Sequence, residues 1–260
     1  MPKSKNNRKG KSRNDRRPAK RSKASYRENP YRREAGQSAD PSTRSAPPKQ
    51  PDRQCKYLDR VATLPNLFSP DECADIINNG LNNWTEKESQ IQRDADGKIE
   101  QNFVEDLDYR NTTLFIPSEP DKELFDKILG NIMGFNSSGD GFGFEIAGMA
   151  EPPNMMRYLA PDIHPKGMPG KYDWHMDVGP GPVPSMRKLS YSILLNAGEY
   201  EGGELAFHIG RNAEPHPGQT ETSSVGNIVC FPSYLIHRVL PVTKDTRYSM
   251  VGWVHGNSFR

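Results

Sequence analysis

The sequence predicts a mainly β fold with flanking helices, a double-stranded β-helix or jelly roll, preceded by a disordered basic N-terminal arm. The first 53 residues show no apolar periodicity, and two helical patterns with cap signals follow them. From Phe144 onward, short β-type segments alternate with Gly and Pro, as in all-β barrels and jelly rolls. We expect an arm at 1–53 and a domain at 54–260, with a helical region at 67–134 and a jelly-roll core at 144–254.

The charge of the chain is divided between these two parts. Residues 1–53 carry 17 Lys and Arg against 5 Asp and Glu, a net +12, and residues 54–260 carry 18 against 28, a net −10. With almost no aliphatic side chains, the first part cannot offset its ordering entropy by burial. We therefore expect the arm to be a solubilising tail, a segment that binds nucleic acid or another polyanion, or a localisation signal.

Two helices are expected before the core. Ser69-Pro70-Asp71-Glu72 combines an N-cap, a proline at the first helical position and a capping-box glutamate. A second helix is expected to start at Ser118-Glu119-Pro120-Asp121 and to end near Gly134. Between them, residues 90–102 indicate a loop or hairpin and residues 109–116 a strand.

The core should consist of short strands. Each is bounded by Gly, Pro or polar residues and is rich in β-forming side chains. The expected strands are 144–149, 154–159, 171–177, 187–196, 204–209, 226–231, 235–240 and 246–254.

The stretch His175-Met176-Asp177 carries the main chemical signal. Successive strand side chains alternate faces, so His175 and Asp177 share one face. An imidazole and a carboxylate on one face are two parts of the 2-His-1-carboxylate triad that holds non-haem Fe(II) with open coordination positions. His237 is the best candidate for the third ligand, and His208 is the alternative.

Ten residues after His237, Arg247 lies in a run that predicts a late strand. Its planar guanidinium can bind a carboxylate through two parallel hydrogen bonds, which the point charge of a lysine does less specifically. Ser249, two positions along, faces the same way and can add a hydroxyl donor. The pair indicates a carboxylate-binding site, although a surface cation on a strand is the alternative.

These signals occur in a fixed order: the His175-Met176-Asp177 motif, Gly202-Gly203-Glu204-Leu205, Phe231-Pro232-Ser233 with the later His237, and Pro241-Val242-Thr243 followed by Arg247. From about Leu67 to Trp253 the chain resembles the Fe(II)/2-oxoglutarate-dependent dioxygenases, in their prolyl 4-hydroxylase-like branch. The resemblance implies Fe(II) on His175, Asp177 and His237, with 2-oxoglutarate on Arg247 and Ser249. It also implies contact of Tyr158 with this cosubstrate, O2 as oxidant and ascorbate (vitamin C) as reductant.

The resemblance further implies hydroxylation of a substrate C–H bond, with proline in a protein or peptide as the leading target. A nucleic-acid base, a small molecule, or a non-catalytic jelly-roll binding module are the alternatives. A halogenase would have a small residue where Asp177 stands. Animal-type collagen prolyl hydroxylases tend to have lysine at the position of Arg247, which weakens a collagen-like assignment.

No apolar run approaches the roughly 20 residues of a membrane helix, and the first residues lack the apolar segment of a secretory signal. Three widely spaced cysteines, Cys55, Cys73 and Cys230, favour neither a disulfide framework nor a zinc site. We therefore expect a soluble, cytoplasmic protein without a membrane partner.

The charge division gives a first testable prediction. If the arm recruits a polyanion, a protein lacking residues 1–53 should bind nucleic acid more weakly than the full chain, whose own affinity should fall steeply with salt because counterions are released. Filter binding at low and moderate salt measures both effects, with basal turnover of 2-oxoglutarate as the control. Equal binding by the two proteins would exclude the recruiting role.

Overall fold

The computed structural model describes residues 60–258 except 96–97, 210–211 and 216–223. The arm expected at 1–53 therefore lies outside the described residues. All described residues belong to the compact unit Gln50–Arg260. Within the described part of the chain, no helix is both long and apolar enough to cross a membrane.

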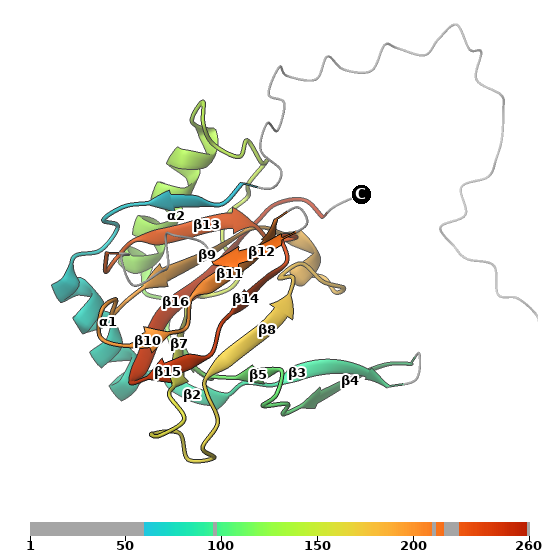
Figure 1. Ribbon diagram of the computed structural model, residues 1–260. Coiled ribbons are helices and arrows are strands. Elements are labelled where there is room, and N and C mark those ends of the chain that lie inside the picture. Colours follow the sequence, from blue (N-terminus) through green and yellow to red (C-terminus); the bar gives the residue numbers. More distant parts are fainter. Residues whose placement is uncertain (1–59, 96–97, 210–211, 216–223, 259–260) are drawn as a thin grey trace, which may run out of the picture. The chain divides into compact units, whose positions relative to one another are not determined.

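Two antiparallel sheets form the centre of this unit (Figure 1). The larger sheet has the strand order β1-β13-β9-β16-β7-β6-β2, with bounds Ala62–Leu64, Ile228–Pro232, Arg187–Leu194, Thr246–His255, Asn154–Leu159, Thr113–Ile116 and Thr85–Glu88. The smaller sheet has the order β12-β11-β14-β8-β5, with bounds Asn212–Pro215, Leu205–Ile209, His237–Val239, Lys171–His175 and Arg110–Asn111.

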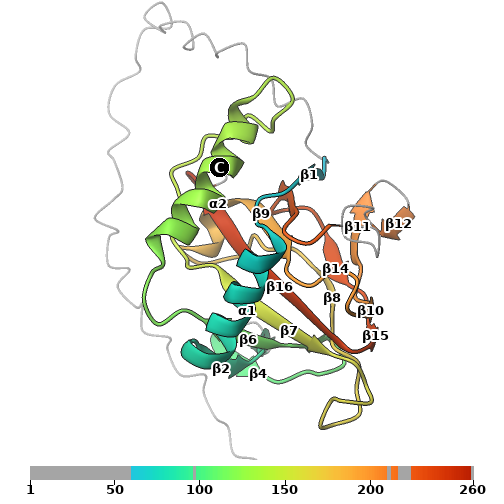
Figure 2. The same ribbon diagram turned by 90° about the vertical axis from the view of Figure 1, so that its left-hand side faces the viewer.

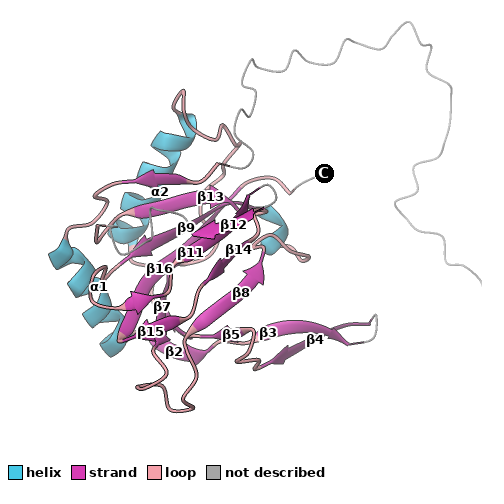
Figure 3. Cartoon of the chain, in the orientation of Figure 1, coloured by secondary structure: helices cyan, strands magenta, loops and turns pink. Residues whose placement is uncertain are grey.

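Two short pairs and a turn complete the β structure (Figure 3). β10 (Glu201–Gly202) pairs with β15 (Val242–Lys244), and β3 (Ile91–Ala95) pairs with β4 (Lys98–Val104) as a hairpin that projects from the two sheets. A 3-10 helix, Pro184–Met186, precedes β9. The hairpin was one of the two alternatives expected for residues 90–102.

Two helices cover the outer face of the larger sheet (Figure 2). α1 (Pro70–Asn83) has the predicted capping box, in which Ser69 Oγ accepts from Glu72 N and Glu72 accepts from Ser69 N. α2 (Lys122–Ser137) begins later than predicted, because the carboxylate of Asp121 caps it by accepting from Leu124 N at 3.0 Å. It also extends three residues beyond the predicted end at Gly134.

Strand alternation divides the larger sheet into two chemically different faces. On β13, Ile228 and Cys230 pack into the cluster beneath the helices, whereas Val229 and Phe231 pack into a second cluster with Leu205 of the other sheet. β16 follows the same alternation, since its even-numbered Met250 and Val254 pack under the helices. Its odd-numbered residues are thereby directed into the space between the sheets.

The predicted fold class is confirmed, and seven of the eight predicted core strands occur close to their expected bounds. The strand predicted at 144–149 is wrong, because only an isolated bridge joins Gly148 to His255. The side chain of Asn136 accepts from Phe144 N at 3.0 Å and donates to Phe144 O at 2.9 Å. These two bonds satisfy the backbone groups that a neighbouring strand would otherwise pair.

The strand expected at 109–116 is divided at Thr112. Its first part, β5, pairs with β8 in the smaller sheet, and its second part, β6, pairs with β7 in the larger one. The chain therefore crosses between the sheets at this point, which brings Arg110 to the rim of the space they enclose.

The helix–sheet contact gives a second prediction. Ile128 of α2 is fully buried, so Ile128→Ala should lower the free energy of unfolding by about 2 to 5 kcal/mol through lost burial and a cavity. Met133 lies on the same helix at 42% exposure, so Met133→Ala is the matched control and should cost much less. Urea denaturation measures both, and equal losses would show that α2 is not anchored through this face.

Candidate metal centre

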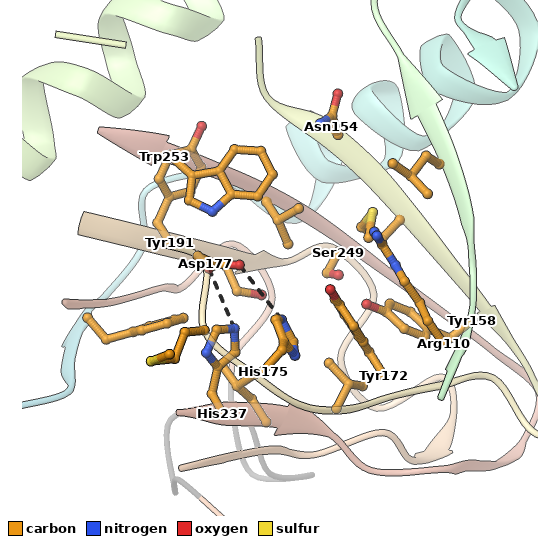
Figure 4. Close-up of a pocket in the computed structure, with 18 of the residues that line it drawn as sticks. Arg110, Asn154, Tyr158, Tyr172, His175, Asp177, Tyr191, His237, Ser249 and Trp253 are labelled. Carbon is orange, nitrogen blue, oxygen red and sulfur yellow. Dashed lines mark ion pairs between the residues drawn. The ribbon is translucent and has the colours of Figure 1, made fainter. Parts of the chain in front are cut away.

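The structure brings His175, Asp177 and His237 together between the two sheets. His175 ends β8 and lies directly opposite His237, the first residue of β14. Their Nε2 atoms are 3.7 and 3.5 Å from the two carboxylate oxygens of Asp177. All three candidate ligand atoms lie within 4.8 Å of one another, so one ion can contact them together. Figure 4 shows both rings directed at the carboxylate.

The backbone fixes the orientation of both imidazoles. The Nδ1 atom of His175 lies 2.7 Å from Asp173 O, and the Nδ1 atom of His237 lies 2.9 Å from Leu235 O. A carbonyl can only accept, so Nδ1 must carry the proton in each ring, and Nε2 presents its lone pair to the site. The arrangement is the one that metal-binding histidines typically show.

Electrostatics favour a neutral His175 beside an ionised Asp177. Burial, and after it the adjacent His237, lower the pKa of His175 to about 3. Burial alone would raise the pKa of Asp177, but His237, His175 and hydrogen bonds from Ser190 and Trp253 outweigh it, so that the pKa is lowered. Because the Nδ1 contacts direct both Nε2 lone pairs at the site and Asp177 is ionised, the cluster offers two nitrogen ligands and one anion to a divalent cation.

Asp177 is also held in place by neutral hydrogen-bond donors. Ser190 Oγ donates to Asp177 Oδ2 at 2.6 Å and lies 3.0 Å from Ser233 Oγ. Trp253 provides a further side-chain hydrogen bond to this carboxylate. Sequence analysis singled out neither Ser190 nor Trp253 as a partner of Asp177, because nothing in the local sequence links either residue to it.

A partly buried ion pair, Arg187–Glu151, contacts the backbone of Asp177. Arg187 donates to Glu151 through Nε at 2.7 Å and Nη2 at 2.6 Å, and through Nη1 to Asp177 O at 3.0 Å. Its Cζ atom is 3.5 Å from the centre of the Trp253 ring, and His255 Nε2 is 3.1 Å from Glu151. Arg187 thus joins the backbone of Asp177 to the ring that hydrogen-bonds its side chain.

Arg247 and Ser249 lie at the other end of the same space. Arg247 is 1% exposed and donates from Nη1 to Ser249 Oγ at 2.8 Å, so the two residues share a face as predicted. Tyr158 is paired with Arg247 in register across β7 and β16, and its ring centre is 5.1 Å from the guanidinium. Tyr200, which sequence analysis did not single out, also hydrogen-bonds Arg247.

The glycine pair before β11 makes room for this arginine. Gly203 has φ +71°, and a Cβ atom placed there would lie 2.6 Å from Arg247 Cδ. Any larger residue would therefore both strain the backbone and displace the arginine stem.

A cavity of about 240 Å³ connects the three ligands to Arg247. Its walls combine apolar side chains, such as Met156 and Val239, with aromatic and charged ones. The residues predicted for the site all line it: His175, Asp177, His237, Arg247, Ser249 and Tyr158. Arg110, Asn154 and Tyr172 also line it and were missed, because they are distant in sequence and carry no motif.

His208, the alternative third ligand, does not join the cluster. On β11, Phe207 packs inward beside the ring of His237, whereas the exposed His208 contacts Trp174 on the outer face of the sheet. The alternation of β11 therefore excludes His208 from the set formed by His175 and Asp177.

Comparison with known proteins agrees with this geometry. Residues 157–255 match the family model of the 2OG-Fe(II) oxygenase superfamily. A PKHD-type hydroxylase of Hyphomonas neptunium is 31% identical over 103 residues, 38% of this chain and 44% of the relative. One of Synechococcus is 34% identical over 85 residues, 32% and 35% of the respective chains. The matched part thus spans less than half of these curated relatives.

Two solved structures share the fold. An oxidoreductase of the 2OG-Fe(II) oxygenase family from Burkholderia pseudomallei has a TM-score of 0.50 at 18% identity and covers 76% of this chain and 86% of its own. A prolyl hydroxylase from Trichoplax adhaerens, in complex with a hypoxia inducible factor peptide fragment, has a TM-score of 0.53 at 14% identity and covers 75% and 83%. The stretch that matches the family model, residues 157–255, is the one that carries the ligand cluster and Arg247, so the part of the chain that forms the site is similar to the 2OG-Fe(II) oxygenase superfamily.

Proposed function

We propose that this protein is an Fe(II)- and 2-oxoglutarate-dependent dioxygenase that hydroxylates a C–H bond, with proline in a peptide or protein as the leading substrate. The observation that carries the proposal is that one cavity contains both a group of residues suited to a cation and a pair of residues suited to an anion. The ligand cluster lies at one end, and the Arg247–Ser249 pair lies at the other.

The residues present suit ferrous iron. Two imidazoles and one carboxylate leave coordination positions open, which distinguishes such a site from a closed structural site. When bound, the metal supplies the coupling of 2-oxoglutarate and O2 to substrate oxidation, with succinate, CO2 and the hydroxylated product as the outcome. The family resemblance also points to ascorbate as the reductant that keeps the iron ferrous.

The chain contributes orientation and shielding. Arg247 and Ser249 would hold the far carboxylate of 2-oxoglutarate, and Tyr158 forms the wall beside it. The apolar side chains of Met156, Val239 and their neighbours exclude water from the part of the cavity between the Arg247–Ser249 pair and the ligand cluster. A volume of about 240 Å³ is below the roughly 300–1,000 Å³ of drug-sized pockets, so it suits a five-carbon dicarboxylate and leaves the substrate at the mouth.

Proline-containing peptides lead as substrates because the relatives named above include a prolyl hydroxylase bound to a peptide fragment. The sequence relatives are named PKHD-type hydroxylases. Incubation with Fe(II), 2-oxoglutarate and pools of peptides, nucleic acids or small amino acids, followed by mass spectrometry, tests this choice. A gain of one oxygen in the peptide pool supports it, and no gain in any pool together with no succinate would indicate a binding module.

The ligand set gives a third prediction. Asp177→Ala or His237→Ala should weaken Mn(II) binding, a redox-stable substitute for Fe(II), by more than about 100-fold. The reason is that loss of a residue that merely hydrogen-bonds a metal ligand already costs about 10- to 100-fold. Calorimetry measures the affinity, and succinate formation should disappear in parallel.

The matched control is His208→Ala, which removes an exposed imidazole from the same sheet and should change neither measurement. Near-normal metal affinity in the His237→Ala protein would transfer the third-ligand role to another residue.

The carboxylate anchor gives a fourth prediction. Truncating one partner of a buried charge pair typically costs about 2 to 5 kcal/mol, so Arg247→Ala should raise the 2-oxoglutarate concentration needed for half-maximal turnover accordingly. Arg247→Lys keeps the charge but loses the planar fork and should be affected less. Equal 2-oxoglutarate affinity in Arg247→Ala and the unmodified protein would show that the cosubstrate is anchored elsewhere.

A further inference from the structure

Arg110 forms part of the cavity wall but belongs neither to the ligand cluster nor to the Arg247–Ser249 pair. It lies on β5, the edge strand of the smaller sheet, and lines the cavity together with Tyr172 and His175. Figure 4 shows its side chain beside Tyr158 and Tyr172. Among the described residues, its guanidinium hydrogen-bonds only Gln90 O, from Nη1 at 3.5 Å, the outer limit for such a bond.

A column of planar groups fixes the position of this guanidinium. The Cζ atom of Arg110 lies 4.4 Å from the centre of the Tyr172 ring. The Tyr172 ring in turn stacks on the His175 ring, with centroids 3.5 Å apart and planes 15° apart. Arg110 is therefore separated from a candidate metal ligand by one aromatic ring, so it is held close to the place where chemistry would occur.

Among the described residues, the charges around the cavity leave Arg110 without a counter-ion. Arg187 is paired with Glu151, and under the proposed function Arg247 is paired with the far carboxylate of 2-oxoglutarate. The near carboxylate of 2-oxoglutarate and Asp177 together offset the two charges of Fe(II). The ion pairs formed among the described side chains do not include Arg110.

We propose that Arg110 receives a carboxylate of the substrate, so that the protein prefers substrates with an anionic group close to the hydroxylated carbon. The proposal rests on the function proposed above and adds the substrate's charge to it. A guanidinium already oriented by stacking loses little freedom when it binds, and it can offer two parallel N–H donors to a carboxylate. A neutral substrate would leave this cation in a partly dry site with no anion.

The carboxylate has two possible sources, an acidic side chain near the target residue or a free C-terminal carboxylate. Two pairs of probes separate them. The first comparison uses a set of capped peptides that place one glutamate at each of the three positions on either side of proline. Each of these peptides is compared with the same peptide carrying glutamine. The other pair is a capped dipeptide ending in proline with a free carboxylate or with a carboxamide.

Arg238 provides a matched control on the same sheet. Its Cζ atom lies 4.4 Å from the ring centre of Trp174, which neighbours His175 on β8, so it repeats the stacking of Arg110 on Tyr172. It lies between His237 and Val239, which both face the cavity, and it therefore faces outward. Arg238→Gln thus removes the same charge and stacking contact without touching the cavity.

The test measures binding rather than turnover. The probes are titrated into the full-length protein loaded with Mn(II) and 2-oxoglutarate, for the unmodified chain, Arg110→Gln, Arg110→Lys and Arg238→Gln. We expect the unmodified protein and Arg238→Gln to bind carboxylate probes about 10- to 100-fold more tightly than their amide partners. Arg110→Gln should lose this preference, and Arg110→Lys should keep part of it.

Three results would overturn the inference. The first is the absence of any carboxylate preference in the unmodified protein with either pair of probes. The second is an equal loss of affinity for the carboxylate probe and its amide partner in Arg110→Gln, which would show that Arg110 only holds Tyr172 in place. The third is a weaker 2-oxoglutarate affinity in Arg110→Gln. Failure of the unmodified protein to bind Mn(II) or 2-oxoglutarate would instead contradict the proposed function.

Discussion

The pairing of β8 with β14 is the constraint on which the site depends. It sets His175 directly opposite His237. Asp177 follows the end of β8, and its carboxylate lies beside both rings. A slip of one residue would turn one imidazole to the outer face, where Trp174 and Arg238 now lie, because strand side chains alternate with a period of two. The packing of Phe207 and Phe231 around His237 opposes such a slip, since both rings would lose buried contacts.

An irregularity in this pairing adds a second wall. Between the pairs His237↔His175 and Val239↔Tyr172, β8 uses one residue more than β14, which is a bulge. Regular alternation would place Tyr172 and His175 on opposite faces. The extra residue places them on the same face, where their rings stack and where Tyr172 carries the guanidinium of Arg110. The bulge thus allows Tyr172 both to hold the ring of His175 and to position the guanidinium of Arg110 at the cavity wall.

Sequence patterns predicted the parts of the site that obey simple periodicity. Arg247 and Ser249 share a face because they are two residues apart on a regular strand. His208 remained the alternative ligand in the sequence, and only the observed packing of β11 excludes it. The bulge could not be predicted, because no residue type marks it. The strand predicted at 144–149 failed for a related reason: the side chain of Asn136 satisfies the backbone of Phe144, a long-range contact that local β propensity does not contain.

The residues around Asp177 show how the fold divides its charges. Ser190 and Trp253 hold the carboxylate through neutral donors, so they orient it without cancelling the charge that an Fe(II) ion needs. Arg187 is kept from forming an ion pair with that carboxylate, because Glu151 binds its guanidinium bidentately and only the backbone carbonyl of Asp177 is left for the remaining donor. A free arginine at this place would compete with the metal for Asp177. The Glu151–Arg187 pair therefore supports the site mechanically while keeping the only carboxylate of the ligand cluster available to a cation.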